Sequence, residues 1–136
     1  SVTTVFSRKP KGHGQAEERP EIPKASEDAQ SETWTVPEDL GRRYTRVSGD
    51  FNPIHLYSWT AKPFGFKRAI IHGMWSMAHA LSKINPNPKR VEVHFIRPVE
   101  LPSKPRFVRD TEDGQERFWI YHPQSQKICL WGQLEV

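Results

Sequence analysis

The stretch HGMWSMAHALSKI at residues 72–84 decides the fold. The sequence NPNP at residues 85–88 ends it firmly, because proline and asparagine disfavour continuation of a helix. We therefore expect the longest helix of the chain at residues 72–84. Apolar side chains recur in it at the spacing of a helix with one buried face, namely at Met74, Met77, Ala78 and Leu81.

Beyond this helix the period of the apolar side chains changes to two, which is typical of strands with one buried face. Asp113 and Gly114 favour a turn between two such strands. One helix followed by antiparallel strands predicts an α+β domain in which the helix covers one face of the sheet. The expected strands lie at residues 91–95, 118–121 and 128–134, with a further candidate at residues 105–109.

The segment before the helix is rich in turn-forming residues. Residues 37–43 favour a turn that leads toward a polar loop at residues 48–50, and a dense loop at residues 50–54 follows it. A short helix is expected at residues 55–61, starting near Pro53, because proline is tolerated in a first turn. Residues 62–65 are expected to end it.

The N-terminal third differs from the rest in composition. Residues 2–8 are of strand type, whereas residues 8–32 combine prolines, glycines and charges with little apolar surface. We interpret residues 10–33 as a flexible linker and residues 34–136 as the folded domain. Residues 1–9 are then the closing strand of a preceding unit, and a disordered tail is the alternative interpretation.

Length and composition exclude several classes of protein. The 136 residues fit one small domain, and no run approaches the ~18 apolar residues of a membrane helix. Residues 1–15 lack the pattern of a secretory signal, so a cytoplasmic protein without membrane partners is expected. The single cysteine, Cys129, excludes an intramolecular disulfide and favours a buried structural thiol.

The net charge of +4 is unevenly distributed. Residues 34–136 hold fifteen basic and ten acidic side chains, whereas residues 1–33 are close to neutral. This surplus suits a small acidic ligand and lacks the density of a nucleic-acid surface. Ordinary solvated lysines and arginines are the alternative explanation.

The loop at residues 48–55 concentrates groups with chemical use. An aspartate and a histidine held on one rigid loop, here Asp50 and His55, can together bind a water molecule and remove its proton. The simpler explanation for Asp50 and Asn52 is that they form Asx turns.

A second candidate is His72 with Gly73, at the start of the expected helix. The N–H groups there have no intrahelical partner, so a developing oxyanion would be stabilised. Gly73 as a plain helix cap is the alternative. His72 and His79 could meet on one helix face, but no third ligand lies nearby and no metal is expected.

Residues 44–55, YTRVSGDFNPIH, resemble the signature of the MaoC-like, or type 2, enoyl-CoA hydratase family. Residues 70–75, IIHGMW, continue the resemblance. It implies a hot-dog fold, in which a curved antiparallel sheet wraps around one long central helix. It also implies a hydro-lyase, a hydratase or dehydratase of acyl-CoA thioesters in fatty acid metabolism.

The resemblance implies a role for each matching residue. Asp50 and His55 would activate the water that adds to a trans-2-enoyl thioester, in a reversible reaction that yields an (R)-3-hydroxyacyl thioester. The Gly73 N–H would bind the thioester oxygen, and Ser48 and Asn52 would support the loop. No cofactor is implied, since the substrate is itself a thioester of CoA or of an acyl carrier.

The resemblance also bears on partners. Paired units form the acyl pocket in this family, so a second hot-dog unit is expected, either in a homodimer or as a preceding half of a double hot dog. A hot-dog thioesterase and a non-catalytic acyl-CoA-binding subunit are the alternative functions. Candidate contacts to CoA are Arg68, Lys89, Arg90 and Arg97.

Overall fold

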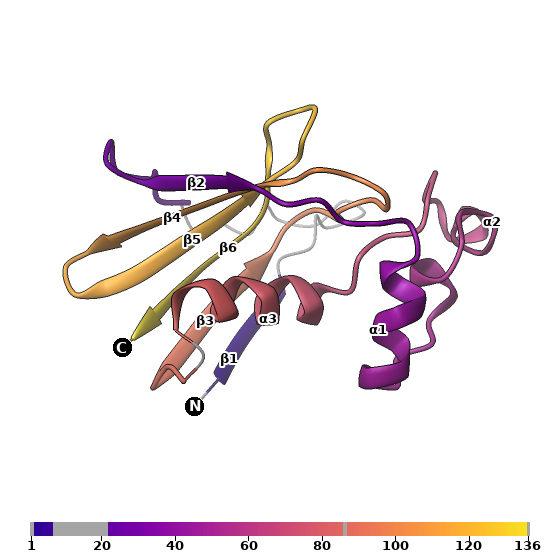
Figure 1. The fold of residues 1–136 in the computed structure, drawn as a ribbon, viewed down its shortest axis with the longest axis horizontal. Coiled ribbons are helices and arrows are strands. Elements are labelled where there is room, and N and C mark those ends of the chain that lie inside the picture. The colour runs from indigo at the N-terminus through magenta and orange to yellow at the C-terminus, as the bar shows by residue number, and fades with distance from the viewer. Residues whose placement is uncertain (1, 7–21, 86, 136) are drawn as a thin grey trace, which may run out of the picture.

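The computed structural model describes residues 2–6, 22–85 and 87–135. Six strands form one sheet in the order β1-β3-β6-β5-β4-β2, and every neighbouring pair is antiparallel except β1 and β3 (Figure 1). The expected late strands are thus present, and the α+β class is confirmed. The strands are β1 (Val2–Phe6), β2 (Gln30–Thr33), β3 (Arg90–Phe95), β4 (Arg106–Glu112), β5 (Gln115–Tyr121) and β6 (Ile128–Glu135).

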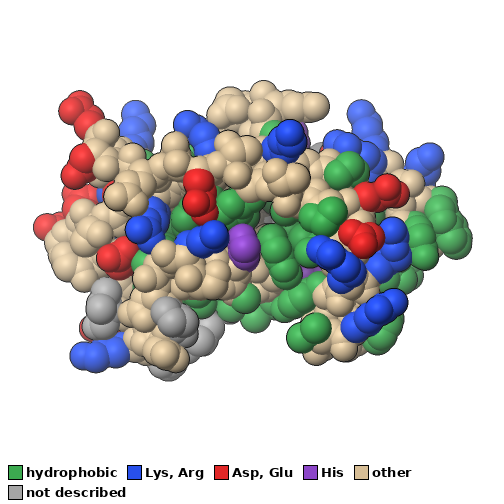
Figure 2. All heavy atoms as spheres, viewed as in Figure 1, with side chains coloured by type: hydrophobic (Ala, Val, Ile, Leu, Met, Phe, Trp, Pro, Cys, Tyr) green, Lys and Arg blue, Asp and Glu red, His purple; other side chains and the backbone are tan. Residues whose placement is uncertain are grey.

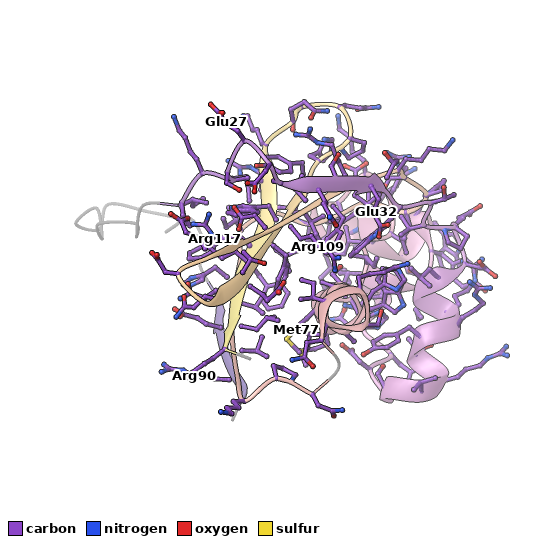
Figure 3. All side chains as sticks on the ribbon, turned by 60° about the vertical axis from the view of Figure 1, so that its left-hand side comes forward. Glu27, Glu32, Met77, Arg90, Arg109 and Arg117 are labelled. Carbon is purple, nitrogen blue, oxygen red and sulfur yellow. The ribbon has the colours of Figure 1, made fainter. Side chains whose placement is uncertain are left out.

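The helix α3 (Gly73–Ile84) lies across one face of this sheet, as expected (Figure 1). The apolar spacing identified its buried face only in part, because Met77 is buried and Leu81 half-buried, whereas Met74 and Ala78 are exposed. Met77 points from α3 toward the strands (Figure 3), and with Ala80 it is buried in the main core. Alternate residues of β3 and β5 complete that core, because successive side chains of a strand point to opposite faces. These residues are Val91, Val93, Phe118 and Ile120.

The opposite face of the sheet carries a second cluster, built on Val108, Trp119 and Trp131. Residues 22–29 lie against it and contribute Ile22, Ala25 and Ala29. The indole N–H of Trp119 donates to the carbonyl of Pro23 (3.0 Å). We call residues 22–29 the strap.

The expectation of a flexible linker is wrong for the strap and β2. Residues 22–33 lie within the segment 10–33 that we interpreted as flexible, yet they pack on the sheet or pair with β4. Residues 7–21 lie outside the described residues. Partial burial of three apolar strap side chains, together with the pairing of β2 with β4, holds a segment that is too polar to form a core of its own.

The N-terminal residues 2–6 are a strand, as their composition predicts. They pair in parallel with β3 of the sheet, with Val2 opposite Val91 and Phe6 opposite Phe95. The parallel direction differs from the all-antiparallel sheet expected from the resemblance. The assignment of residues 1–9 to a preceding unit stays a prediction.

Between β2 and α3 the chain forms α1 (Leu40–Ser48), α2 (Ser58–Ala61) and two short 3-10 helices, η1 (Pro53–His55) and η2 (Lys62–Phe64). These elements lie together beyond one end of the sheet (Figure 1). The expected turn is present at residues 38–39, closed by the bond from the Leu40 N–H to the carbonyl of Pro37 (3.2 Å), but residues 40–43 belong to α1, which was not expected. The expected helix at residues 55–61 is divided between η1 and α2.

No helix among the described residues has the length and apolar character needed to cross a membrane.

Candidate active site

The helix α1 fixes the turn that carries His55. Gly41 approaches this turn so closely that a Cβ there would lie 1.8 Å from the backbone oxygen of His55. Arg42 donates to the carbonyl of Leu56 (2.7 Å) and lies over the ring of Tyr57 (4.3 Å). Only glycine therefore permits this contact between α1 and η1.

The loop that follows α1 is ordered by its own side chains. Gly49 ends the helix with a positive φ of 74°, which glycine adopts without strain. The Ser48 hydroxyl accepts from the N–H of Asp50 (3.2 Å), and Oδ1 of Asp50 accepts from the N–H of Asn52 (3.1 Å). Asn52 caps η1 by accepting from the N–H of Ile54 (3.2 Å). The Asx-turn explanation therefore holds, and it leaves Oδ2 of Asp50 without a hydrogen bond among the described residues.

His55 is buried and faces Asp50. Its Nδ1 lies 2.8 Å from the carbonyl oxygen of Ile70, so Nδ1 carries the proton and donates. Its Nε2 keeps a lone pair and lies 3.9 Å from Oδ2 of Asp50. One water molecule could hydrogen-bond both atoms across this separation.

The protonation of His55 is biased toward the neutral ring. Burial, which disfavours the charged form, lowers the pKa of His55 below its ordinary 6.5. The hydrogen bond to Ile70 opposes this effect, while neighbouring His72 adds to the lowering and Asp50 works against it. A neutral ring whose lone pair is not engaged in a hydrogen bond is the state that a general base requires.

His72 joins this pair. Its ring stacks on His55 with centroids 3.8 Å apart, and Tyr44 meets it edge-on. Its Nε2 lies 3.1 Å from the backbone oxygen of Asp50 and 4.0 Å from Oδ2 of the same residue. The expectation that His72 could meet His79 is wrong, since His79 packs instead between Trp34 and Trp75.

Asp50, His55 and His72 also offer three metal-ligand atoms within 4.8 Å of one another. Two imidazoles and a carboxylate suit Zn²⁺. The Nε2 of His72, however, faces a carbonyl oxygen, which can only accept, so this nitrogen carries a proton and has no lone pair for a metal. The hydrogen bonding thus favours a bound water over a bound metal.

Gly73 is the first residue of α3 and follows His72 directly. Among the described residues no group accepts from its N–H, as expected for a helix start. A Cβ at this position would lie 2.8 Å from the ring of Phe95, so glycine brings the helix close to β3. Backbone bonds from Ile71 to Val99 (2.8 Å) and from Leu101 to Ala69 (2.8 Å) hold the approach to the helix.

The four basic residues expected to contact CoA are not brought together. Arg68 forms an ion pair with Glu100 (2.6 Å), and Arg97 donates to the carbonyl of Ile128 (2.8 Å). Lys89 precedes β3 and Arg90 is its first residue, whereas the ring of Phe95, its last residue, lies next to Gly73. At about 3.3 Å per residue, the length of the strand separates Arg90 from the helix start.

Sequence reasoning did not identify the surroundings of the site. Exposed apolar side chains gather over α1 and α2 together with lysines and arginines (Figure 2). Most of them lie in loops and short helices, where apolar residues carry no period, whereas Met74 was expected in the buried stripe of the helix at residues 72–84 and is exposed instead. We call this set the apolar rim: Val47, Phe51, Tyr57, Trp59, Phe64 and Met74.

Comparison with known proteins gives consistent matches. At 46% identity over 65 residues, 3-hydroxyacyl-thioester dehydratase X of Mycobacterium tuberculosis covers 46% of this chain and 23% of its own length. The crystal structure of HtdX from the same organism superposes with a TM-score of 0.70 and 31% identity, over 76% of this chain and 46% of that one. The chain therefore spans less than half the length of these relatives.

A shorter protein matches in fold along nearly its whole length. The (R)-hydratase from A. caviae superposes with a TM-score of 0.65 at 21% identity, over 79% of this chain and 91% of that one. The family model described as MaoC like domain matches residues 20–122. The chain has the hot-dog fold that the resemblance implies, and it belongs to the MaoC-like domain family.

Proposed function

We propose that the chain catalyses the reversible hydration of a trans-2-enoyl thioester to an (R)-3-hydroxyacyl thioester. One observation carries the proposal: the Nδ1–H bond to Ile70 leaves the lone pair of His55 Nε2 facing the Asp50 carboxylate. The relatives named as a 3-hydroxyacyl-thioester dehydratase and as (R)-hydratases support this reaction class.

The reaction begins with a water molecule between Asp50 and His55. Nε2 of His55 accepts a proton from the water, while Oδ2 of Asp50 orients it. The water oxygen bonds to C3 of the substrate, and the electrons of the C2–C3 double bond move toward the thioester oxygen. A proton then returns from the catalytic pair to C2, which completes the addition of water.

The thioester oxygen gains negative charge in this step. The N–H of Gly73 has no acceptor among the described residues, and with the positive end of α3 it lies next to His72, which stacks on His55. A donor fixed at the place where charge develops stabilises the transition state without reorganisation. The scheme needs no cofactor, because the thioester carbonyl of the substrate itself takes up the electrons of the C2–C3 double bond.

The apolar rim bears on the partner. Val47 precedes the loop, Phe51 lies in it and Met74 follows Gly73, and these residues are 83%, 63% and 47% exposed. We propose that a second hot-dog unit covers them and completes a pocket for the acyl chain. Arg68, Lys89, Arg90 and Arg97 remain proposed contacts to the phosphates of a CoA carrier.

The test is hydration of crotonyl-CoA by the full chain in its paired state, followed by loss of the ultraviolet absorbance of the conjugated thioester. Asp50→Asn and His55→Gln should each lower kcat on the order of 10²-fold or more. Asp39→Asn is the matched control, since Asp39 is an exposed carboxylate paired only with Arg43 among the described residues. Release of free thiol without hydration would instead identify a thioesterase, and binding without turnover would identify a binding subunit.

A further inference from the structure

His72 is the most enclosed side chain of the site, with 3% of its surface exposed, and the proposed mechanism gives it no role. It occupies the N-cap of α3, a position where side chains commonly bond to the helix. The ring of His72 makes no such bond. It is turned instead toward Asp50 and His55.

The bond from His72 to Asp50 anchors the loop. Nε2–H donates to the backbone carbonyl of Asp50 across 3.1 Å. Among the described residues, every other hydrogen bond of residues 49–52 stays within residues 45–55. The donor of His72 is therefore what ties the exposed Asp50 loop to the start of α3.

The same ring also supports His55. The two imidazoles stack at 3.8 Å with an interplanar angle of 23°, so rotation of the His55 ring would require displacement of His72. Tyr44 closes another side of His72, with centroids 4.9 Å apart. The ring face of His72 thus contacts His55, the proposed base, and its Nε2–H bonds the main chain of Asp50.

The ring of His72 carries a cost that packing does not require. Its Nδ1 is buried and has no partner among the described residues. A buried polar atom without a hydrogen bond destabilises the folded state, and a leucine would fill similar space without this cost. An imidazole at this position therefore serves something other than filling the core.

We propose that His72 is a positioning residue, which sets the separation between the Asp50 carboxylate and Nε2 of His55. This inference rests on the proposed hydration activity for its kinetic test. His72 acts through its two neighbours and exchanges no proton with the substrate.

Two substitutions separate the donor from the volume. His72→Leu keeps the bulk and removes the N–H, and should lower kcat on the order of 10²-fold, because small misplacements of catalytic groups have effects of this size. KM should change less than about threefold, since no contact with substrate is lost. His72→Gln places an amide N–H near the position of Nε2, and should restore kcat to within about threefold of the wild type.

His94→Leu is the matched control for burying a leucine in place of a histidine. His94 is 5% exposed, stacks on Trp131 at 4.5 Å and also has a buried Nδ1 without a partner, but it lies on the far face of the sheet. This variant should keep the kcat of the folded protein. Unchanged kcat in His72→Leu would overturn the proposal, as would equal losses in the folded Leu and Gln variants.

A measurement without substrate distinguishes failure of this inference from failure of the proposed function. The ¹⁵N shifts of the imidazoles in the wild-type chain should identify His72 as the Nε2–H tautomer and His55 as the Nδ1–H tautomer. The Nδ1–H tautomer at His72 would overturn the inference even in an active enzyme. The expected tautomers in a chain that does not hydrate crotonyl-CoA would retain the positioning role and reject the hydratase.

Discussion

His55 illustrates how one hydrogen bond determines the use of a side chain. With the carbonyl of Ile70 accepting from Nδ1, the only lone pair of the neutral ring lies on Nε2, toward Asp50. If Nε2 carried the proton instead, the lone pair would lie on Nδ1, away from Asp50, and His55 could not act as a base at the site. At the scale of single residues, the backbone oxygen of Ile70 is therefore as important as the carboxylate.

The pH dependence of the reaction follows from the same ring. Because burial lowers the pKa of His55, the ring stays neutral below pH 6.5 and gains a proton only as the pH falls through the lowered value. We expect the acid limb of kcat/KM to have its midpoint below 6.5. The free energy of unfolding should fall as the pH drops from about 6.5 to the lowered pKa, since in this range the unfolded chain binds the proton and the folded chain does not.

His79→Gln is the control for this profile. Burial also lowers the pKa of His79, but this residue lies between Trp34 and Trp75, away from Asp50. Its removal should leave the acid limb in place. A midpoint above 6.5, or one that moves in the His79 variant, would contradict the assignment of the limb to His55.

At the scale of elements, α3 supplies the backbone N–H of Gly73 as a donor, and proline is the only substitution at this position that removes it. Proline is tolerated at the first position of a helix, and His72 before it has the extended φ of −66° and ψ of 128° that proline requires of its neighbour. Gly73→Pro therefore deletes the N–H while keeping the helix.

Gly73→Ala provides the matched comparison, because its Cβ meets the ring of Phe95 as that of proline would, while the N–H stays. Relative to the alanine variant, the proline variant should lose a further 10²–10³-fold in kcat, the usual effect of removing one oxyanion donor. Hydration of crotonyl-CoA measures both. Equal rates in the two variants would exclude the Gly73 N–H as the donor.

At the scale of the whole molecule, a buried ion pair joins the strap to the sheet. Arg117 donates twice to Asp110, at 2.8 and 2.6 Å, and the N–H of Ser26 in the strap donates to the same carboxylate (2.8 Å). Arg117 lies on the face of the sheet away from α3 (Figure 3). The arrangement compensates charges that would otherwise be costly to bury.

Asp110→Asn should lower the free energy of unfolding at pH 7 by about 3 kcal/mol, since it removes the buried counter-charge of Arg117 and leaves only the exposed carboxylate of Glu112. Burial opposes ionisation of Asp110, but the hydrogen bonds from Arg117 and Ser26 outweigh it and lower its pKa. The wild-type advantage should therefore disappear as the pH falls through that lowered pKa. Denaturant unfolding at pH 7 and in acid measures both effects.

Glu112→Gln is the control, because Glu112 also pairs with Arg117 but its side chain is 54% exposed. A solvated pair contributes about 1 kcal/mol or less. Equal losses in the Asp110 and Glu112 variants would show that burial of the pair does not determine its contribution.

The periodic parts of the fold could be predicted from the sequence. The apolar spacing of residues 72–84 predicts α3, and the alternation after residue 88 predicts the strands. The helix α1 escaped prediction because its buried residues are Leu40, Gly41 and Thr45, which form no apolar stripe. The strap escaped because its few apolar residues gain their burial only from the finished sheet.

By itself the sequence determined the helix-on-sheet class and the cluster of Asp50, Asn52 and His55, since period and local turn chemistry depend on neighbours along the chain. Only the tertiary structure decided the tautomer of His55 and the place of His72. These depend on the carbonyl of Ile70 and on that of Asp50, which come from residues 15 and 22 positions away. Every residue has a backbone oxygen, so no sequence pattern predicts which of them will accept a hydrogen bond from a given side chain.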